Sequence, residues 1–425
     1  MSLNIPTTEL PRVVIIGGGF AGLELANRLA KRSFQVVILD RNNYHQFQPL
    51  LYQVATAGLE PSSIAFPYRK IFQKYEHFHF RMVEVLEVYP ENKRLLTNRG
   101  EILFDYLVVA TGAGNNFFGN ANIEKYSFPM KSISEALALR NTIFQRFENA
   151  LIAEDPLEIE ANLNIAIVGG GPTGVEVAGA LAEMRNKVLP KDYPEMDFRK
   201  MRIILIQGDK LLLSSMSGES SKKAADYLTE MGVEIHLDSK VTDYDGKHVY
   251  FNGEFAIPTK TLIWAAGIIG NRIKGLAPES YGSGGRVLVD KFNKCIQHPA
   301  IFAIGDVALI QGDEVYPKGH PQMAQPAIQQ GKRLAKNLIH IQKNEAIKPF
   351  RYIDLGSMAT IGRNKAVVEL PGWKFQGLFA WLVWLVVHLR SILGIKNRFV
   401  VLLNWIWNYF TYNLSLRLII KSKEK

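Results

Sequence analysis

Val13-Val14-Ile15-Ile16-Gly17-Gly18-Gly19-Phe20-Ala21-Gly22 decides the fold of this chain, which carries a second copy of the pattern, Ile165-Ala166-Ile167-Val168-Gly169-Gly170-Gly171-Pro172-Thr173-Gly174. Residues 17–30 and 169–182 are identical at eight of fourteen positions. In each copy a run of apolar β-formers leads into G-x-G-x-x-G, and a helical pattern follows. Glycine permits the tight turn, the approach of a pyrophosphate to the backbone and close helix–strand packing, and the helix N-terminus attracts the phosphates. Two copies therefore predict two dinucleotide sites.

The residue after the second strand of each copy is expected to read the adenosine ribose. In the first copy the strand at 35–39 leads to Asp40, whose carboxylate can accept both ribose hydroxyls. In the second copy the strand at 202–206 leads to Gln207. A neutral amide can hydrogen-bond a hydroxyl and also tolerates a 2′-phosphate, which a carboxylate would repel. The second nucleotide is therefore predicted to be NADH, NADPH or either.

Strand endings extend the duplication beyond the glycine turns. The strand at 105–109 ends in Ala110-Thr111-Gly112, and the strand at 261–264 ends in Ala265-Ala266-Gly267. A strand at 298–306 ends in Gly305-Asp306. Because the carboxyl ends of parallel strands face the ligand in such sheets, Asp306 is expected to contact the ligand of the first unit, or else to cap the turn.

Composition limits the class of protein. The chain has 425 residues, 47% of them hydrophobic and 21% charged, which is enough for two or three domains with real cores. The single cysteine, Cys295, excludes an intramolecular disulfide, and the chain starts without an apolar secretory segment. A protein facing a reducing cytoplasm is expected, and no metal site is predicted.

The C-terminal segment carries most of the net charge of +10 and most of the tryptophan. From Gly372 onward there is one acid, Glu424, and eight basic residues: Lys374, Arg390, Lys396, Arg398, Arg417, Lys421, Lys423 and Lys425. The apolar runs 377–389 and 399–412 are shorter than the roughly 18–20 residues of a spanning helix. Amphipathic helices lying in the membrane interface are predicted, and a buried dimerisation hairpin is the alternative. Basic residues among membrane-type aromatics argue against nucleic-acid binding.

The predicted fold is α/β, with two Rossmann-like dinucleotide-binding domains and a C-terminal amphipathic helical segment for membrane anchoring. The expected boundaries are 1–118 with 271–345 for a discontinuous FAD domain, 119–270 for the NAD(P)H domain, and 346–425 for the membrane-association domain.

The chain resembles the type II NADH dehydrogenases, which are single-subunit NADH:quinone oxidoreductases that do not pump protons. The resemblance lies in the two glycine turns, the Ala-Thr-Gly and Ile-Gly-Asp endings, the amphipathic C-terminal helices and four motifs: Tyr44-His45-Gln46-Phe47-Gln48-Pro49-Leu50-Leu51-Tyr52-Gln53-Val54-Ala55-Thr56, Gly171-Pro172-Thr173-Gly174-Val175-Glu176, Ala324-Gln325-Pro326-Ala327-Ile328-Gln329-Gln330-Gly331 and Gly356-Ser357-Met358-Ala359-Thr360-Ile361-Gly362-Arg363.

This resemblance implies that two electrons pass from NADH or NADPH through FAD to a membrane quinone in ping-pong fashion. Glu176 is then the candidate for orienting the nicotinamide end, and Gln325 and Gln329 are candidates for contacting the quinone. Four residues apart, the two glutamines share one helix face, and bracing of the helix is the alternative for either one.

The predicted FAD-binding residues are Gly17, Gly19, Phe20, Ala21, Gly22, Asp40, Ala110, Thr111, Gly112, Asp306 and Ala324. The predicted NAD(P)H-binding residues are Gly169, Gly171, Pro172, Thr173, Gly174, Glu176, Gln207, Ala266 and Gly267.

Two other functions remain open, namely an FAD-dependent NAD(P)H reductase of a protein electron carrier and a membrane-attached redox-sensing flavoprotein. Disulfide reductases and sulfide:quinone oxidoreductases need cysteines that a chain with one thiol lacks. The family resemblance further implies a homodimer in the respiratory chain, attached peripherally to the cytoplasmic face of the inner membrane.

Overall fold

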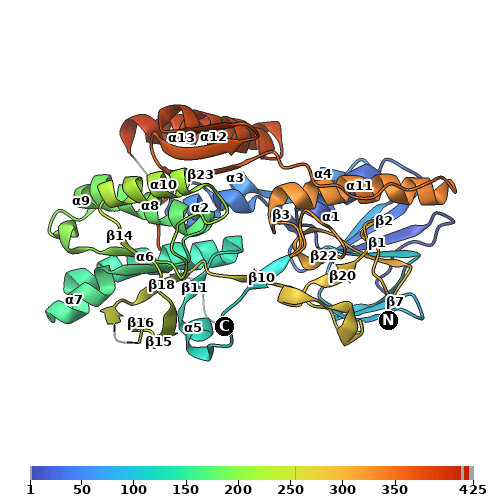
Figure 1. Cartoon of the computed structure of the whole chain (residues 1–425), viewed down its shortest axis with the longest axis horizontal. Helices are drawn as coiled ribbons and strands as arrows, with labels where there is room; N and C mark the ends of the chain where they lie inside the picture. The colour runs from blue at the N-terminus through green and yellow to red at the C-terminus, as the bar shows by residue number, and fades with distance from the viewer. Residues whose placement is uncertain (1, 254, 413–415, 421–425) are drawn as a thin grey trace. The chain divides into compact units, whose positions relative to one another are not determined.

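The computed structural model describes residues 2–253, 255–412 and 416–420. The chain divides into two compact units (Figure 1). Unit 1 comprises Met1–Gln46, Ala65–Gly114 and Ile268–Asp354, and unit 2 comprises Phe47–Ile64, Asn115–Gly267 and Leu355–Lys425. This division differs from the expected boundaries because 47–64 and the C-terminal segment both group with the second unit. The short strands β10 (Ala113–Asn115) and β19 (Ile268–Gly270) stand where the chain passes between units.

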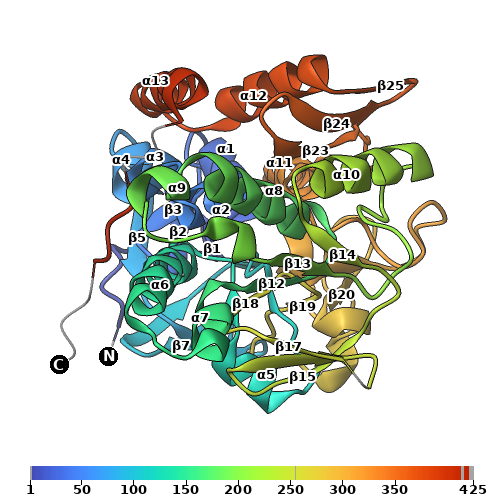
Figure 2. The same cartoon turned by 90° about the vertical axis from the view of Figure 1, so that its left-hand side faces the viewer.

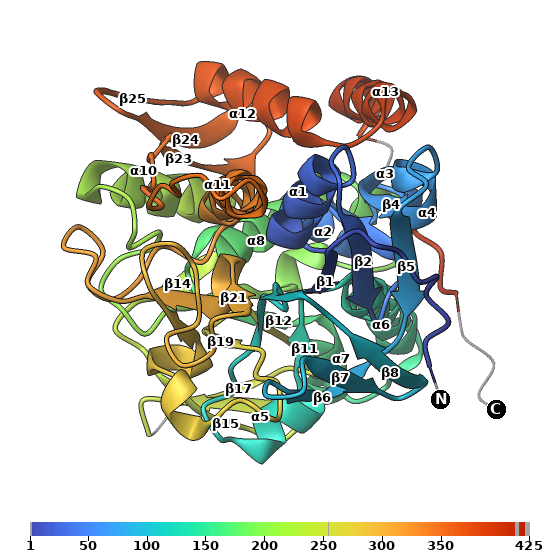
Figure 3. The ribbon, with the colours of Figure 1, turned by 90° about the vertical axis from the view of Figure 1, so that its right-hand side faces the viewer.

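Unit 1 is built on a five-stranded parallel sheet in the order β21-β9-β1-β2-β5. Its strands are β1 (Arg12–Ile16), β2 (Gln35–Asp40), β5 (Phe78–Met82), β9 (Tyr106–Val109) and β21 (Ile301–Ala303). Helices α1 (Phe20–Leu29) and α11 (Ala324–Gln342) lie side by side over one face (Figure 3). The other face packs on the antiparallel sheet of β6 (Val85–Tyr89), β7 (Arg94–Thr97) and β8 (Gly100–Leu103). The remaining elements are β3 (Tyr44–Gln46), β4 (Ala65–Pro67), α4 (Tyr68–Phe72), β20 (Val287–Val289) and β22 (Ala308–Ile310).

Unit 2 repeats this plan with a parallel sheet in the order β11-β18-β12-β13-β14. Its strands are β11 (Phe128–Pro129), β12 (Ile165–Val168), β13 (Ile203–Ile206), β14 (Glu234–His236) and β18 (Thr261–Trp264). One face packs on the antiparallel sheet of β15 (Val241–Tyr244), β16 (His248–Phe251) and β17 (Phe255–Pro258). The helices are α2 (Leu51–Ala55), α3 (Pro61–Ile64), α5 (Ala121–Tyr126), α6 (Ile133–Ile152), α7 (Pro156–Leu163), α8 (Pro172–Lys187), α9 (Leu189–Asp192) and α10 (Gly218–Glu230). The longest of them, α6, follows Ser132, whose side chain caps the helix in a capping box with Glu135.

The C-terminal segment completes unit 2. Strands β23 (Ser357–Gly362), β24 (Lys365–Leu370) and β25 (Trp373–Gln376) form an antiparallel sheet that contacts α8 and α10, and α12 (Leu378–Ser391) packs on its β24 (Figure 2). Helix α13 (Ile395–Thr411) follows and contacts α3. Within the described residues, no helix combines the length and apolarity needed to cross a membrane.

A glycine decides how closely this segment approaches α8. A Cβ added to Gly179, in the middle of α8, would lie 1.6 Å from the backbone oxygen of Ile361 in β23. No real side chain tolerates that distance, so the helix and the strand touch backbone to backbone.

We therefore expect Gly179→Ala to lower the free energy of unfolding by at least about 1–3 kcal/mol, because α8 and β23 must separate. This loss of stability is opposite to the effect of helix propensity, because replacing glycine with alanine in a helix interior normally stabilises the protein by roughly 0.5–1 kcal/mol. Gly218→Ala at the start of α10 is the matched control, since a Cβ there meets nothing within 4 Å. Thermal unfolding of both variants tests this, and a G179A protein as stable as G218A would contradict it.

Candidate functional site

The first glycine turn forms an open cradle in unit 1. Gly17 has φ +97°, and a Cβ on it would lie 2.4 Å from the backbone oxygen of Ala110 at the end of β9. A Cβ on Gly19 would meet nothing within 4 Å, and no side chain caps the N-terminus of α1. The N-terminus of α1 thus lies beside open space at Gly19 without a side-chain cap, as a pyrophosphate site requires.

Asp40 braces this turn. Its Oδ2 accepts hydrogen bonds from the Gly18 backbone N–H at 2.8 Å and from the Tyr68 hydroxyl at 3.2 Å, and its Oδ1 accepts one from the Asn42 N–H at 2.8 Å. Burial raises the pKa of Asp40, and these hydrogen bonds oppose the rise. Tyr68 was not foreseen, because nothing in the sequence shows that its ring lies beneath Gly18.

The predicted Ala110-Thr111-Gly112 ending lies beside this turn and is tied to Asn271. The Thr111 hydroxyl donates to the Asn271 backbone oxygen at 2.9 Å, and the Asn271 amide donates to the Thr111 oxygen at 2.8 Å. Gly112 has φ +66°, and a Cβ on it would meet nothing within 4 Å. The structure thus places Ala110, Thr111 and Gly112 at the carboxyl end of the sheet together with Gly17.

Helix α11 and the residues just before it hold the turn that carries Asp306. The Gly305 N–H donates to Gln330 Oε1 at 2.6 Å, and the Gln322 amide donates to the Asp306 backbone oxygen at 2.9 Å. Gln330 is buried and was missed by sequence reasoning, although it stands beside Gln329 in the same motif. A Cβ on Gly331 would lie 2.6 Å from the Ala21 oxygen, so α11 packs closely against α1.

The two glutamines expected to contact quinone differ in their surroundings. Both polar atoms of the Gln329 side-chain amide bond the Ile353 backbone: its Nε2 donates to the Ile353 oxygen at 2.8 Å, and its Oε1 accepts from the Ile353 N–H at 3.0 Å. These contacts favour the bracing alternative for Gln329. Gln325 lies in the first turn of α11, next to Ala324, with which the helix begins.

The second glycine turn repeats the geometry in unit 2. Gly169 has φ +108°, and a Cβ on it would lie 2.7 Å from the Ala265 oxygen at the end of β18. A Cβ on Gly171 would meet nothing within 4 Å, and α8 starts at Pro172 without a side-chain cap. Gln207, which is buried, accepts the Gly170 N–H at 2.7 Å. The residues predicted for the second nucleotide, except Glu176, therefore gather around a second cradle.

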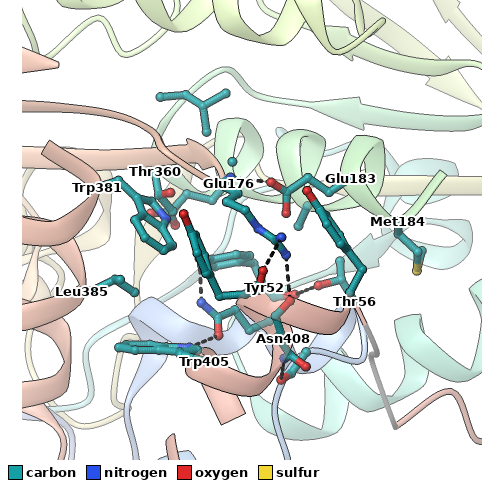
Figure 4. Close-up of a pocket in the computed structure, with 18 of the residues that line it drawn as sticks. Tyr52, Thr56, Glu176, Glu183, Met184, Thr360, Trp381, Leu385, Trp405 and Asn408 are labelled. Carbon is teal, nitrogen blue, oxygen red and sulfur yellow. Dashed lines mark hydrogen bonds between the residues drawn. The ribbon is translucent and has the colours of Figure 1, made fainter. Parts of the chain in front are cut away.

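Glu176 faces a different part of unit 2. Its carboxyl lies in a pocket of about 140 Å³ among α2, α8, β23, α12 and α13 (Figure 4). The lining residues are Tyr52, Gln53, Thr56, Gly58, Glu176, Ala180, Glu183, Met184, Val188, Thr360, Ile361, Gly362, Arg363, Trp381, Trp384, Leu385, Trp405, Asn408, Tyr409 and Tyr412. Aromatic side chains form much of its wall, and the pocket lies beneath the two C-terminal helices.

Burial raises the pKa of Glu176 from its ordinary value of 4.5 to about 8, although the Thr360 N–H and the Trp384 indole N–H oppose the rise. The indole lies near the carboxyl without the geometry of a regular hydrogen bond. Glu176 is therefore mostly protonated at neutral pH. Glu24, its counterpart in the first copy, instead forms an ordinary ion pair with Arg28 at 2.6 Å.

Several neutral polar groups share the pocket with this carboxyl, although Glu183 and Arg363 also line it. The Trp405 indole donates to Gln53 Oε1 at 2.8 Å, and Gln53 Nε2 donates to the Tyr52 hydroxyl at 2.8 Å. Burial raises the pKa of Tyr52 well above its ordinary value. It also lowers the pKa of His388, whose ring stacks on Trp384 with centroids 4.0 Å apart, to about 4. At neutral pH these groups carry no charge.

Two families match the chain. Residues 11–331 match the pyridine nucleotide-disulphide oxidoreductases, and residues 355–411 match the NDH2 C-terminal domain. The type II NADH:quinone oxidoreductase Ndh of Mycobacterium tuberculosis is 35% identical over 94% of this chain and 89% of its own length. The chain belongs to the type II NADH:quinone oxidoreductases. NdhA of the same organism, also a type II NADH:quinone oxidoreductase, is 36% identical over 93% of this chain and 86% of its own length.

Solved structures agree with this family in fold. NDH2 of Plasmodium falciparum in complex with NADH has a TM-score of 0.88 at 22% identity, covering 97% of this chain and all of that one. The expected family and the expected α/β fold with two Rossmann-like units are confirmed.

The raised pKa of Glu176 makes the stability of this type II NADH:quinone oxidoreductase depend on pH. The folded state holds a proton that the unfolded chain releases near its ordinary pKa, so stability falls as pH rises from about 5 to about 8, by at most about 1.4 kcal/mol per pH unit. We expect Glu176→Gln to flatten this part of the pH dependence of thermal unfolding. Glu195→Gln, at an exposed position in the same unit, should not. Parallel pH curves for wild type and E176Q would contradict the assignment.

Proposed function

We propose that the chain oxidises NADH at the cradle of unit 2, with FAD held at the cradle of unit 1, and reduces a quinone drawn from the membrane. Membership of the family supports the reaction, and the two open glycine turns provide the nucleotide sites. FAD, when bound, supplies a ring that accepts a hydride from NADH and passes two electrons on. With one proton from solution, NADH and quinone become NAD⁺ and quinol.

The residues of unit 1 fit FAD. The cradle presents the N-terminus of α1, which no side chain caps, to the pyrophosphate, and Asp40 offers a carboxylate to the ribose. The residues proposed to hold FAD are Gly17, Gly19, Phe20, Ala21, Gly22, Asp40, Ala110, Thr111, Gly112, Asp306 and Ala324. Gln330 is added as the residue that positions the turn before Asp306. For NADH the proposed set is Gly169, Gly171, Pro172, Thr173, Gly174, Gln207, Ala266 and Gly267.

We assign Glu176 to the quinone rather than to the nicotinamide end. The observation that carries this assignment is a buried carboxyl, with its pKa raised by that burial, in an aromatic pocket beneath helices with exposed apolar faces. Aromatic walls suit a quinone ring, and a carboxylic acid with a pKa near working pH can donate a proton to the quinone oxygen as electrons arrive. Gln325 stays a candidate quinone contact, whereas Gln329 is assigned to bracing Ile353.

The membrane contact is proposed from the outer faces of α12 and α13. Large apolar side chains point to solvent at helical spacing in both: Leu378, Leu382 and Val386 in α12, and Ile395, Phe399, Leu403, Ile406 and Phe410 in α13. Exposed Lys374, Arg390 and Lys396 lie in the same segment and suit anionic headgroups. Arg417 is instead paired with Asp192 at 2.6 Å, and Lys421, Lys423 and Lys425 lie outside the described residues.

The cytoplasmic face of the inner membrane and a homodimer stay predictions, and the dimer is checked by the mass of the detergent-solubilised protein. A carrier-protein reductase would share the two nucleotide cradles, as the ferredoxin reductase of Rhodopseudomonas palustris shares the fold with a TM-score of 0.65. The C-terminal match at 355–411 favours the quinone reductase over that alternative and over a redox sensor.

For the quinone assignment we expect Glu176→Gln to slow flavin reoxidation by a short-chain quinone by about 10²–10⁴-fold, the usual contribution of a general acid. The wild-type rate should fall as pH rises through about 8, because Glu176 loses its proton there. Bleaching of the flavin by NADH, and reduction of ferricyanide, which takes no proton, should stay within about twofold. Stopped-flow absorbance measures all three. Slower bleaching by NADH with unchanged reoxidation in this variant would show instead that Glu176 orients the nicotinamide end.

For the membrane contact we expect Val386→Glu combined with Phe410→Glu to move the protein from floating anionic vesicles to the soluble fraction. Each change places a charge on a side chain that is exposed, 65% for Val386 and 77% for Phe410. Leu157→Glu in α7, at 67% exposure, is the matched control and should leave flotation unchanged. Equal flotation of all variants would contradict the contact.

A further inference from the structure

The residue at the end of the second strand accepts the equivalent hydrogen bond in both units. Asp40 ends β2 and accepts the Gly18 N–H at 2.8 Å, and Gln207 follows β13 and accepts the Gly170 N–H at 2.7 Å. In each case a side-chain oxygen pins the second glycine of the turn. The two positions are therefore equivalent, but only Asp40 supplies a negative charge.

The negative charge that position 207 lacks is present two residues later, at Asp209. Gln207 Nε2 donates to Asp209 Oδ2 at 3.0 Å. One end of the buried amide thus holds the glycine turn and the other end holds a carboxylate. An amide has the donor and the acceptor needed to link these two groups, whereas a carboxylate at position 207 has no donor and would repel Asp209.

The backbone fixes Asp209 at this place. The Asp238 N–H donates to the Asp209 oxygen at 3.0 Å, and the Ser239 N–H donates to the Gln207 oxygen at 2.9 Å, so the loop after β14 supports the loop after β13. The Leu213 N–H donates to the Gly170 oxygen at 2.8 Å and closes the loop onto the glycine turn. Strands β13 and β14 are neighbours in the sheet (Figure 2). Asp209 itself is exposed and open to a ligand.

We propose that Asp209, positioned by Gln207, is the carboxylate that binds the adenosine ribose hydroxyls and selects NADH against NADPH. This inference rests on the proposed function, because it names the substrate of the unit 2 cradle. A carboxylate accepts hydrogen bonds from the 2′- and 3′-hydroxyls and repels a 2′-phosphate. Lys210 and Lys240 lie in the same two loops and would attract a phosphate, and Asp238 opposes them. Asp209 decides the balance because Gln207 ties it to the glycine turn.

The test measures binding without turnover. Isothermal titration of the FAD-loaded protein compares ADP-ribose with 2′-phospho-ADP-ribose. Wild type should prefer ADP-ribose by about tenfold or more. Asp209→Asn should weaken ADP-ribose binding by about tenfold to a hundredfold, the usual loss of a hydrogen bond to a charged group, and should abolish the preference. Asp209→Glu, which restores a carboxylate, should retain part of it.

Asp238→Asn removes a charge from the neighbouring loop and leaves the Asp209 carboxylate in place, so it should reduce the preference for ADP-ribose less than D209N does and should not abolish it. Gln207→Ala should lower the preference as well as the affinity for both ligands, whereas a purely structural role would lower both affinities equally. A wild-type protein without preference, or a D209N protein that keeps it, would overturn the proposal.

Flavin bleaching by NADH and by NADPH, measured in parallel, distinguishes a failure of the proposed function from a failure of the role proposed for Asp209. Selective binding of ADP-ribose without bleaching by NADH would refute the proposed function and leave Asp209 assigned. Bleaching by NADH with an unaltered preference in D209N would refute only the role of Asp209.

Discussion

The close approach of two backbones at the start of each glycine turn is the constraint on which both nucleotide sites depend. A Cβ on Gly17 would lie 2.4 Å from the Ala110 oxygen, and one on Gly169 would lie 2.7 Å from the Ala265 oxygen. Only glycine lets the first strand end so close to its neighbour. The following helix therefore starts at the carboxyl end of the sheet without a side-chain cap and beside open space, which is the property that a pyrophosphate site needs.

The two units share this turn but differ in the elements that pack around it, and these differences give the units different roles. In unit 1, α1 packs on α11, and Glu24 forms an ion pair with Arg28. In unit 2, Gly179 brings β23 against α8, and the same glutamate of the repeat, Glu176, is buried and protonated. The C-terminal segment thus changes the chemistry of a duplicated residue and joins the proposed quinone pocket to helices that turn apolar side chains outward.

The sequence predicted the features that depend on local pattern. The glycine turns and the two C-terminal helices follow from residue types and spacing, and the structure contains them. Features that depend on distant contacts were not predictable. The grouping of 47–64 with unit 2, Tyr68 beneath Gly18, and the burial of Glu176 under β23 and α12 need the fold itself. Asp209, the acid proposed to read the ribose, stands two residues beyond the position given by the pattern, and only the hydrogen bond from Gln207 reveals its link to the glycine turn.

The most direct test of the central claim, that quinone enters the pocket around Glu176, is photolabelling of the lipid-bound protein with an azido-quinone and mapping of the label by mass spectrometry. The account predicts labels on the lining of this pocket, in α12 and α13 at Trp381, Leu385 or Tyr409, and their loss when unlabelled quinone competes. Competable labels confined to unit 1, with none on these helices, would contradict it.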